Sequence, residues 1–359
     1  MKGIILVGGR GTRLRPLTFF RPKPLVPLVN RPFLEYQLDL LRRYGVEEVI
    51  LCVNYQAKKL MRHFADGNRF GLTIRYAAEQ EPLGTAGALK NAAAMVDTGP
   101  VIVLNGDILT DVDLEQVLRT HRESGAWATL TLVEVDDPTR YGLVVLDRRG
   151  RVQRFLEKPS WDEVTARTVN AGIYVLEPAV FDYIPAGREV SVERETYPQL
   201  LQRGVPVSGH VARSYWLDIG TPDKYLQAHW DILEQRVSVP VPGREVSPRL
   251  WFGQGAEVSP QATLIPPVVL GEGVSVRAGA TVGPYCVLGD QVTVREEASA
   301  AHAVLGRRCV LGRGARVQQA VLDQETRLEE GACVDGLLVA AGSVLGRGTR
   351  PAGLPGPPR

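Results

Sequence analysis

Three glycines and two cationic side chains follow the first apolar segment of the chain. The segment reads LVGGRGTRLRPLT, with Gly8, Gly9 and Gly11 ahead of Arg13, and Lys23 follows in RPKPL. Glycines let backbone N–H groups turn towards a ligand and approach it closely. Arg13 and Lys23 add positive charge beside this turn. We therefore expect a polyanionic ligand, such as a nucleoside triphosphate, although a tight turn with solvated basic side chains also fits the glycines.

Two common phosphate-binding motifs do not match this segment. A Walker A loop requires Gly-Lys-Ser/Thr, whereas Gly11 is followed by Thr12 and Arg13. A dinucleotide-binding loop of the form G-x-G-x-x-G requires a glycine at the position of Leu14. The segment therefore predicts a phosphate loop of another kind.

Two aspartates follow apolar, strand-like segments that are far apart in the chain. Asp107 ends VIVLNGD, and Asp218 lies in YWLDIG. Two carboxylates at strand ends can share one Mg²⁺, which binds few carboxylates and keeps phosphate oxygens and water as its other ligands. Taken singly, each aspartate is better explained as a solvated cap or turn residue.

Two lysines stand out because the chain otherwise prefers arginine. Only seven of its 42 basic residues are lysines, and Lys23 in PKP and Lys158 in EKP both adjoin proline. We interpret these two lysines as sites that need a compact point charge. The alternative for Lys158 is a surface ion pair with Glu157, which contributes little energy.

The elements that must position these residues alternate between strand-like and helix-like segments over residues 1–235. KGIILVG is a continuous apolar run, typical of a strand buried on both faces, and RPFLEYQLDLLRRYG has one apolar helical face. EEVILCVNY, QAKKLMRHFAD and PVIVLNGD repeat the alternation. The pattern predicts a doubly wound, mostly parallel α/β sheet that binds ligands past the carboxyl ends of its strands.

The pattern changes near residue 238. A proline-rich stretch predicts a linker over 237–250, and beyond it an apolar residue recurs every six positions, with a phase slip after residue 300. This period predicts a triangular β-solenoid over 251–346 that resembles the left-handed parallel β-helix of hexapeptide-repeat proteins. We expect 347–359 to be a disordered tail. The first seven apolar anchors are Val258, Leu264, Leu270, Val276, Val282, Leu288 and Val294.

Composition excludes several classes of protein. A net charge of +2 gives no strong field for nucleic acid, and no apolar run of membrane-spanning length occurs. We therefore expect a cytoplasmic protein without nucleic-acid or membrane partners. Cys52, Cys286, Cys309 and Cys333 lack C-x-x-C spacing, which disfavours zinc and disulfides and predicts four small buried hydrophobes.

The opening segment LVGGRGTRLRPLTFFRPKPL closely resembles the signature of sugar-1-phosphate nucleotidylyltransferases, the nucleotide-sugar pyrophosphorylases. EPLGTAGAL, NGD, RYGLV, FLEKP, NAGIYV and WLDIGTP follow in the family's order, and a hexapeptide-repeat C-terminus is also common in the family. The resemblance implies a Rossmann-like nucleotide-diphospho-sugar transferase domain over 1–236. It also implies nucleotidyl transfer from a nucleoside triphosphate to a sugar-1-phosphate. The attacking phosphate is already anionic, so positioning and charge neutralisation are expected to drive the reaction.

The resemblance also implies roles for individual residues. Arg13 and Lys23 are expected to contact the triphosphate, Asp107 and Asp218 to hold Mg²⁺, and Lys158 to contact the sugar phosphate; these five are the expected catalytic residues. The expected nucleotide-binding residues are Leu6, Gly8, Gly9, Gly11, Thr12, Arg13, Lys23, Gln80, Gly84, Thr85 and Asp107. The expected sugar-phosphate-binding residues are Gly142, Glu157, Lys158, Asn170 and Gly172.

The choice of substrate depends on finer features. LVGG and EPLGTAGAL look most like mannose-1-phosphate guanylyltransferases, so we expect GTP and mannose-1-phosphate as substrates and GDP-mannose as product. In that subgroup a glutamate usually stands where this chain has Gln80. A carboxylate accepts well from the two donors of guanine, whereas glutamine suits thymine or uracil equally well. Glu79 or Glu81 can substitute if its side chain points inward; glucose-1-phosphate thymidylyl- or uridylyltransferase is the alternative.

Two further interpretations belong to other classes. A non-catalytic regulatory subunit with the same fold would tend to lose the basic residues or the aspartates named above, and this chain retains them. A second, acyltransferase activity on the solenoid would use His302 as a base, but this histidine has no recognisable partner in the sequence. We expect the solenoid to mediate a homo-oligomer instead.

Overall fold

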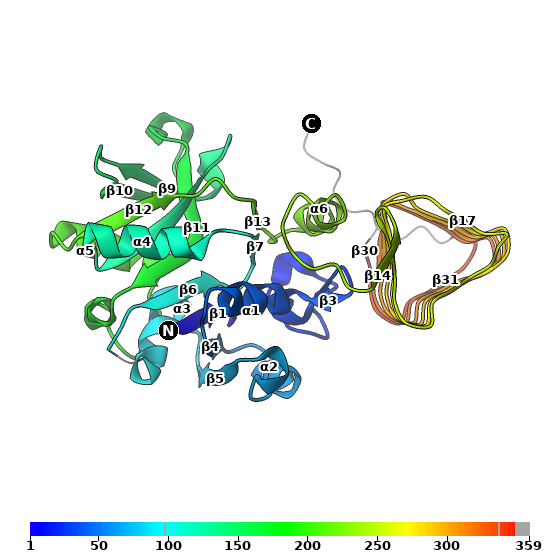
Figure 1. Cartoon of the computed structure of the whole chain (residues 1–359), viewed down its shortest axis with the longest axis horizontal. Coiled ribbons are helices and arrows are strands. Elements are labelled where there is room, and N and C mark those ends of the chain that lie inside the picture. Colours follow the sequence, from blue (N-terminus) through cyan, green and yellow to red (C-terminus); the bar gives the residue numbers. More distant parts are fainter. Residues whose placement is uncertain (97, 337, 349–359) are drawn as a thin grey trace. The chain divides into compact units, whose positions relative to one another are not determined.

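The computed structural model describes residues 1–96, 98–336 and 338–348, and these form two compact units (Figure 1). The first unit comprises Met1–Arg10 and Leu34–Asp218. The second comprises Gly11–Phe33 and the chain from Ile219 onward. The units therefore divide the chain differently from the expected boundary at 236, because two segments of the expected catalytic part pack with the solenoid. The predicted tail falls outside the described residues from 349 onward.

The first unit is built on a nine-stranded mixed sheet with the order β10-β9-β11-β6-β1-β4-β5, extended from β11 by β8 and β12. β1 pairs in parallel with β4 and β6, while β11 pairs antiparallel with β6, β8 and β9. The predicted parallel α/β sheet is thus confirmed, with an antiparallel part that carries β9, β10 and β11. The strands are β1 (Lys2–Leu6), β4 (Glu48–Val53), β5 (Thr73–Ala78), β6 (Val101–Asn105), β8 (Ala128–Glu134), β9 (Gly142–Leu146), β10 (Val152–Glu157), β11 (Thr168–Leu176) and β12 (Val207–Val211).

Helices and a short ribbon complete this unit. β7 (Ile108–Thr110) and β13 (Trp216–Asp218) form a separate antiparallel ribbon. The α-helices are α1 (Phe33–Arg43), α2 (Ala57–Phe64), α3 (Gly84–Ala92), α4 (Leu114–Ser124) and α5 (Tyr197–Gln202). Single turns are η3 (Asn68–Phe70), η4 (Ala93–Met95), η5 (Pro138–Arg140), η6 (Trp161–Glu163), η7 (Pro178–Tyr183) and the π-helical η8 (Val192–Thr196).

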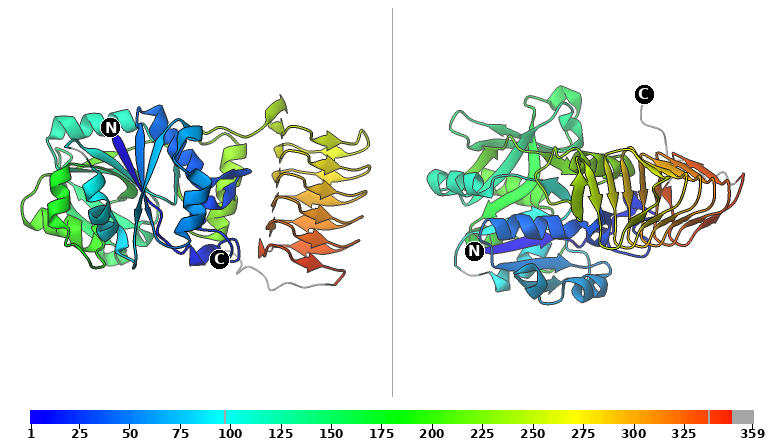
Figure 2. Two further views of the ribbon diagram at one scale, coloured as in Figure 1. Left: turned by 90° about the horizontal axis from the view of Figure 1, so that it is seen from below. Right: turned by 45° about the vertical axis from the view of Figure 1, so that its right-hand side comes forward.

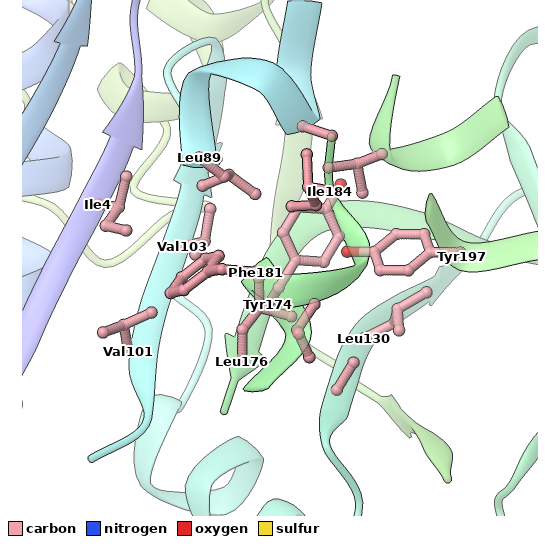
Figure 3. Packing of buried hydrophobic residues seen from close by; sticks show 14 of the residues in the cluster. Ile4, Leu89, Val101, Val103, Leu130, Tyr174, Leu176, Phe181, Ile184 and Tyr197 are labelled. Atoms are coloured by element: carbon pink, nitrogen blue, oxygen red, sulfur yellow. The ribbon is translucent and has the colours of Figure 1, made fainter. Parts of the chain in front are cut away.

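The hydrophobic core of the first unit lies where the sheet meets α3, η7 and α5. Ile4 and Val103 of the sheet, Leu89 of α3, Phe181 of η7 and Tyr197 of α5 belong to one buried cluster (Figure 3). Removing these apolar side chains from water is the main favourable contribution to folding here. The core therefore fixes the strands whose carboxyl ends carry the expected site.

The second unit contains a left-handed, three-sided parallel β-helix whose stacked coils are visible in Figure 2. The seven-stranded sheet comprises β14 (Arg244–Ser247), β15 (Leu250–Phe252), β18 (Val268–Leu270), β21 (Cys286–Leu288), β24 (Ala303–Leu305), β27 (Val321–Leu322) and β30 (Leu338–Val339). The six-stranded sheet comprises β16 (Glu257–Val258), β19 (Ser275–Val276), β22 (Thr293–Val294), β25 (Val310–Leu311), β28 (Arg327–Leu328) and β31 (Val344–Leu345). The five-stranded sheet comprises β17 (Thr263–Leu264), β20 (Thr281–Val282), β23 (Ser299–Ala301), β26 (Arg316–Gln318) and β29 (Cys333–Asp335).

The interior of the solenoid follows the predicted period. The anchors Val276, Val282, Leu288 and Val294 are all at most 1% exposed. The slip in phase arises because Leu288 pairs with Leu305, so the coils shorten by one residue from this point. Cys286 and Cys309 lie inside the solenoid and Cys52 is buried in the first unit, as expected, but the expectation that Cys333 is buried is wrong: it is exposed, on the outer face of β29.

The outer faces of the three sheets differ in polarity. On the seven-stranded sheet, Trp251, Val269, Val287, Val304 and Val321 stand in register between the inward anchors, and none is more than 6% exposed. The equivalent rows of the other two sheets carry Glu257, Ser275, Thr293, Thr263, Thr281 and Ser299. An outward apolar row predicts a covered face, because successive strand residues point to opposite sides.

Segments that precede the solenoid in sequence pack with it in the second unit. They are α6 (Pro222–Leu233) and Gly11–Phe33, which contains η1 (Thr12–Leu14), η2 (Lys23–Leu25) and the hairpin β2 (Pro27–Leu28) and β3 (Arg31–Pro32). The ring of Trp230 on α6 lies 5.6 Å from that of Tyr285, beside β21. Asn30 donates a hydrogen bond to the carbonyl of Leu288. None of the helices described is long and apolar enough to cross a membrane.

Candidate active site

Asp107 and Asp218 lie at the same end of the β7–β13 ribbon. The antiparallel register pairs Asp218 with Ile108, the residue that follows Asp107. The Oδ1 atom of Asp218 is buried. Within the described residues no group of three or more histidine, cysteine or carboxylate side chains forms a complete metal site. Two carboxylates at one ribbon end suit an ion that takes its remaining ligands from phosphate and water.

The NGD turn brings the carboxyl ends of β1 and β6 together. Leu6 pairs with Asn105, and the Gly106 N–H donates to the Leu6 carbonyl at 2.9 Å. A Cβ at Gly106 would lie 2.5 Å from that carbonyl oxygen, so only glycine permits the approach. Asp107 therefore lies just beyond the carboxyl end of β6. The glycine-rich segment begins at the neighbouring carboxyl end of β1.

Glu79, rather than Gln80, faces that glycine-rich segment. A Cβ at Gly8 would lie 3.5 Å from Glu79 Oε1, whereas Gln80 and Glu81 are exposed. The Leu83 N–H donates to Glu79 Oε2 at 3.1 Å and so holds the carboxyl in place. Burial raises the pKa of Glu79, and the bond from Leu83 partly opposes this. Gln80, which we expected to bind the base, is exposed, so its role stays a prediction.

Gly84 and Thr85 begin α3 and join it to η8. Gly84 has a φ of 70°, in the left-handed region. The Thr85 hydroxyl donates to Glu193 Oε2 at 3.0 Å and accepts from the Val192 N–H at 2.8 Å. The expected nucleotide ligand Thr85 therefore uses its hydroxyl to support η8, and Glu193 is a carboxylate that the sequence analysis missed.

Gly142 and Glu157 face each other across β9 and β10. They are paired in register, and a Cβ at Gly142 would lie 3.0 Å from Glu157 Oε2. Burial and the nearby carboxylate of Glu193 raise the pKa of Glu157, while Lys158 lowers it. Lys158 follows directly, with a left-handed φ of 51° and its N–H bonded to the Tyr141 carbonyl. The structure thus brings these three expected sugar-phosphate residues together.

Asn170 and Gly172 lie in an irregular part of β11. Asn170 donates through Nδ2 to the Tyr174 hydroxyl at 2.8 Å and accepts through Oδ1 from the Gly172 N–H at 3.0 Å. Gly172 has a φ of 71°, and a Cβ there would lie 2.7 Å from Asn105 Nδ2. The Asn170 amide therefore shapes this bulge, with one N–H and one lone pair left for a ligand.

Gly9 lies in the first unit, and the remaining expected residues belong to the second. Gly11 has a φ of 59° and precedes η1, and Thr18 donates through its hydroxyl to the Gly11 carbonyl at 2.8 Å. A Cβ at Gly11 would lie 3.1 Å from the Cβ of Lys23, so the segment folds back on itself. A Cβ at Gly220 would lie 2.9 Å from an Arg13 guanidinium nitrogen. Gly11, Arg13 and Lys23 are thus neighbours within this unit.

Two groups of residues result, and they are supported differently. The strand-end group is Asp107, Asp218, Gly142, Glu157 and Lys158, each at or directly beyond the end of a strand. The loop group is Gly11, Thr12, Arg13 and Lys23, on a segment whose only helices are the single turns η1 and η2.

His302 takes part in an aromatic cluster rather than in either group. Its ring stacks on Tyr285 at 5.1 Å and 28°, and its edge meets Trp230 of α6 at 6.3 Å. This packing gives His302 a structural role in joining α6 to the solenoid.

Two protein-family models together match most of the chain. The nucleotidyl transferase family model matches residues 2–235, and the GMPPB C-terminal domain model matches 246–345. A mannose-1-phosphate guanylyltransferase of Mycobacterium tuberculosis is 38% identical over 333 residues, covering 92% of this chain and 82% of the relative. A UTP–glucose-1-phosphate uridylyltransferase of Synechocystis is 37% identical and covers 70% of this chain and 69% of the relative.

A solved structure is also similar. HddC from Yersinia pseudotuberculosis, in complex with GMP-PN, has a TM-score of 0.56 and 30% identity to this chain. The match covers 64% of this chain and 99% of that structure.

Proposed function

The chain belongs to the nucleotidyl transferase family, and from that membership we propose that it transfers a guanylyl group from GTP to mannose-1-phosphate. The products are GDP-mannose and pyrophosphate. The relative from Mycobacterium tuberculosis supports this choice because its similarity extends over both the nucleotidyl transferase part and the solenoid. The observation that carries the choice of base is the Glu79 carboxyl beside Gly8.

Glu79 suits guanine for a chemical reason. Guanine offers the N1–H and the exocyclic amine as adjacent donors, and an ionised carboxylate accepts two parallel hydrogen bonds. Uracil and thymine offer an N–H flanked by carbonyl oxygens, which a carboxylate repels. Gln80, the residue that would accommodate uracil or thymine, is exposed and is not among the atoms nearest to Gly8. Uridylyl or thymidylyl transfer to glucose-1-phosphate is therefore the less favoured reaction.

The reaction needs no protein base. A phosphate oxygen of mannose-1-phosphate attacks the α-phosphorus of GTP, and pyrophosphate leaves from the opposite side. Arg13 and Lys23 neutralise the triphosphate and the departing pyrophosphate, and Lys158 binds and orients the attacking phosphate. Glu157 accepts hydrogen bonds from sugar hydroxyls, and Gly142 leaves room for the ring. Catalysis then consists of alignment and charge neutralisation.

Asp107 and Asp218 fit a magnesium ion, which we propose as the cofactor. Their placement at one ribbon end supplies the one or two carboxylates that Mg²⁺ ordinarily takes from a protein. A bound Mg²⁺ would neutralise charge on the phosphate oxygens. Asp107 and Asp218 themselves contribute by holding that charge at the carboxyl ends of β6 and β13.

Replacing Glu79 by glutamine tests the assignment of the base. The charged acceptor is lost, so kcat/KM for GTP is expected to fall about 10- to 100-fold. The expected change for UTP or dTTP is a small increase or none. The matched control is Gln80→Ala, which alters the neighbouring exposed side chain and should leave kcat/KM for GTP unchanged. The assignment is wrong if Gln80→Ala reduces GTP use and Glu79→Gln does not.

We also propose that the protein forms a homo-oligomer. Among the residues that the structure describes, the outermost strands of the solenoid sheets pair on one side only, which leaves edges for a partner. Light scattering on the purified chain measures the molar mass, and a mass of one chain at assay concentration would reject this proposal.

A further inference from the structure

Arg21 lies within the segment that carries the loop group. It stands two residues before Lys23, and its side chain is 13% exposed. Its guanidinium donates a hydrogen bond of 2.7 Å to Asp323 Oδ1 on the solenoid, 302 residues away in the chain. Asp323 is only 4% exposed, so the pair is removed from solvent. Screening by water and salt is weak at such a site, and the loss of one partner leaves the other charge uncompensated.

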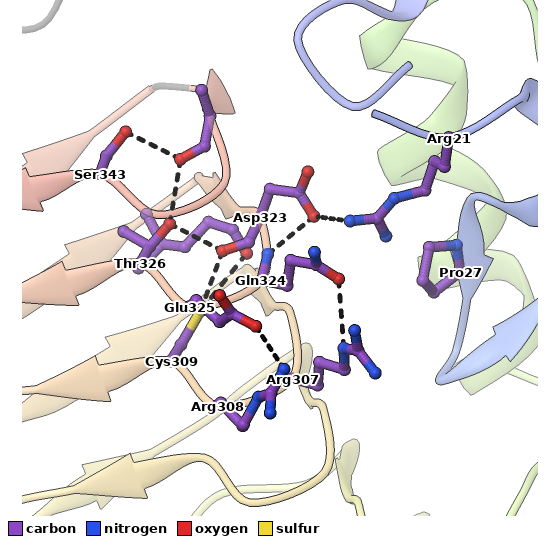
Figure 4. Close-up of polar contacts among 12 residues, drawn as sticks. Arg21, Pro27, Arg307, Arg308, Cys309, Asp323, Gln324, Glu325, Thr326 and Ser343 are labelled. Atoms are coloured by element: carbon purple, nitrogen blue, oxygen red, sulfur yellow. Dashed lines mark hydrogen bonds and ion pairs between the residues drawn. The ribbon is translucent and has the colours of Figure 1, made fainter. Parts of the chain in front are cut away.

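Asp323 is itself held firmly by the solenoid (Figure 4). It follows β27, and its N–H donates to the Val339 carbonyl at 3.0 Å. Its carboxyl accepts a second bond, from the Gln324 N–H at 2.7 Å, and its own carbonyl accepts from the Thr326 hydroxyl at 2.7 Å. Asp323 is therefore a well-supported acceptor to which the side chain of Arg21 is attached.

The other side of Lys23 is also attached to elements of the second unit. The β2–β3 hairpin turns at Val29 and Asn30, whose φ angles of 46° and 62° are left-handed. A β-branched residue rarely adopts this conformation, so neighbouring contacts must hold it. Asn30 donates to the Leu288 carbonyl at 2.7 Å, and the Val29 N–H donates to Nδ1 of the buried His229 on α6 at 3.3 Å. The hairpin is thus attached to both the solenoid and α6.

The segment has little regular structure of its own. η1 and η2 have three residues each, and β2 and β3 have two each. Such short elements cannot fix a lysine side chain by themselves. The bonds at Arg21 and Asn30 lie on either side of Lys23 in sequence, so they attach both flanks of its turn to the second unit.

We infer that Arg21 is a positioning residue, through which Asp323 of the solenoid holds Lys23 in place for the triphosphate. This inference rests on the proposed function, because it takes Lys23 as a triphosphate ligand. The solenoid then contributes to nucleotide binding without touching the nucleotide. Arg21 acts only through the backbone that leads to Lys23.

The variant Asp323→Asn tests the inference in the full-length protein. The KM for GTP is expected to rise roughly 3- to 30-fold, while the KM for mannose-1-phosphate changes less than twofold. A purely structural role would lower the melting temperature without separating the two KM values. Arg21→Lys keeps the positive charge but loses the planar fork, so it should fold and give an intermediate KM for GTP.

The neighbouring pair of Arg308 and Glu325 provides the matched control. Glu325 follows Asp323 by two residues in the same solenoid. The side chains of Arg308 and Glu325 are both about half exposed. Arg308→Gln removes an ion pair of the same type and should leave both KM values unchanged. Binding of a fluorescent GTP analogue, measured without sugar phosphate, gives a second readout that does not depend on turnover.

The outcomes separate this inference from the proposed function. If the wild-type protein neither uses nor binds GTP, the proposed function fails. If the wild-type protein uses GTP, and Asp323→Asn and Arg21→Lys bind and use it as the wild type does, the inference is overturned. Equal rises in both KM values would overturn it too, because they would indicate general loosening of the protein.

Discussion

The strand-end group and the loop group are held in place by different means. Glu157 is placed by the register of β10 on β9, which are strands of six and five residues, and Asp218 ends β13 of the shorter β7–β13 ribbon. Lys23 lies instead in a segment of short turns that side-chain contacts attach to the rest of its unit, among them those of Arg21 and Asn30. Backbone ladders tolerate side-chain changes, whereas single side-chain contacts do not. We therefore expect the loop group, with its proposed triphosphate contacts, to respond to distant mutations more than the strand-end group does.

The solenoid shows the same contrast between local and distant determinants. All three sheets point apolar anchors into the solenoid. Among the described residues, only the seven-stranded sheet also has an apolar row on its outer face. That row is buried in the unit that also contains α6 and Gly11–Phe33. The outer face of the seven-stranded sheet therefore differs from the other two faces of the repeat in being apolar and buried.

Asp107→Asn should have the largest effect and test the strand-end group. The substitution removes one proposed Mg²⁺ ligand, so kcat should fall by about 1,000-fold or more. The strand register does not depend on this carboxylate, so the melting temperature should stay close to that of the wild type. Pyrophosphate release and thermal unfolding measure the two quantities. A variant with near wild-type turnover would remove Asp107 from the metal site.

The pH dependence of GTP use should have an intermediate effect. Because burial raises the pKa of Glu79, its carboxylate is lost at a higher pH than an ordinary glutamate. As the pH falls through this raised pKa, kcat/KM for GTP should drop about tenfold per pH unit. The effect of Glu79 on the free energy of unfolding has the opposite pH dependence. Because its pKa is raised in the folded state, Glu79 contributes stability at low pH, and this contribution is lost as the pH rises through that pKa.

The control for this profile is Glu79→Gln, which cannot titrate. Its kcat/KM for GTP should be low throughout and lack the acid limb assigned to Glu79. An acid limb of unchanged midpoint in this variant would assign the titration to another group.

Asn30→Ala should have the smallest effect, and it tests whether the β2–β3 hairpin contributes to GTP binding. It removes one neutral hydrogen bond, worth about 1 kcal/mol, from a turn that the His229 contact still supports. The KM for GTP should rise by a factor of about 2 to 5, less than for Asp323→Asn. Steady-state kinetics with both substrates measure this change. A change confined to the KM for mannose-1-phosphate would contradict the proposed difference between the two groups.

Much of the strand-end group could be predicted from the sequence because its positions depend on local patterns. Asp107 and Asp218 follow apolar segments, and the hexapeptide anchors reveal the solenoid. The orientation of Glu79 could not be predicted in this way: strict alternation from the buried Ile74 would place Gln80 on the inward face, but the burial pattern of β5 changes phase, so that Ala77 is buried and Ala78 exposed. The family position of Gln80 indicated the neighbouring residue instead.

The attachment of the loop group could not be predicted in the same way. Arg21 and Asp323 are 302 residues apart, and neither belongs to a local motif. Their contact depends on the packing of Gly11–Phe33 with the solenoid, which also explains why the compact units differ from the expected domain boundaries. The row of Trp251, Val269 and Val287 did carry a signal, because outward positions of a solenoid exposed to water are ordinarily polar.

The most direct test of the central claim is a grid of pyrophosphate-release assays with Mg²⁺ on the wild-type protein. GTP, dTTP, UTP and ATP are each combined with mannose-1-phosphate and with glucose-1-phosphate. The account predicts that GTP with mannose-1-phosphate gives the highest kcat/KM of the eight combinations. A strong signal for UTP or dTTP with glucose-1-phosphate and none for GTP, or silence across the grid, would contradict it.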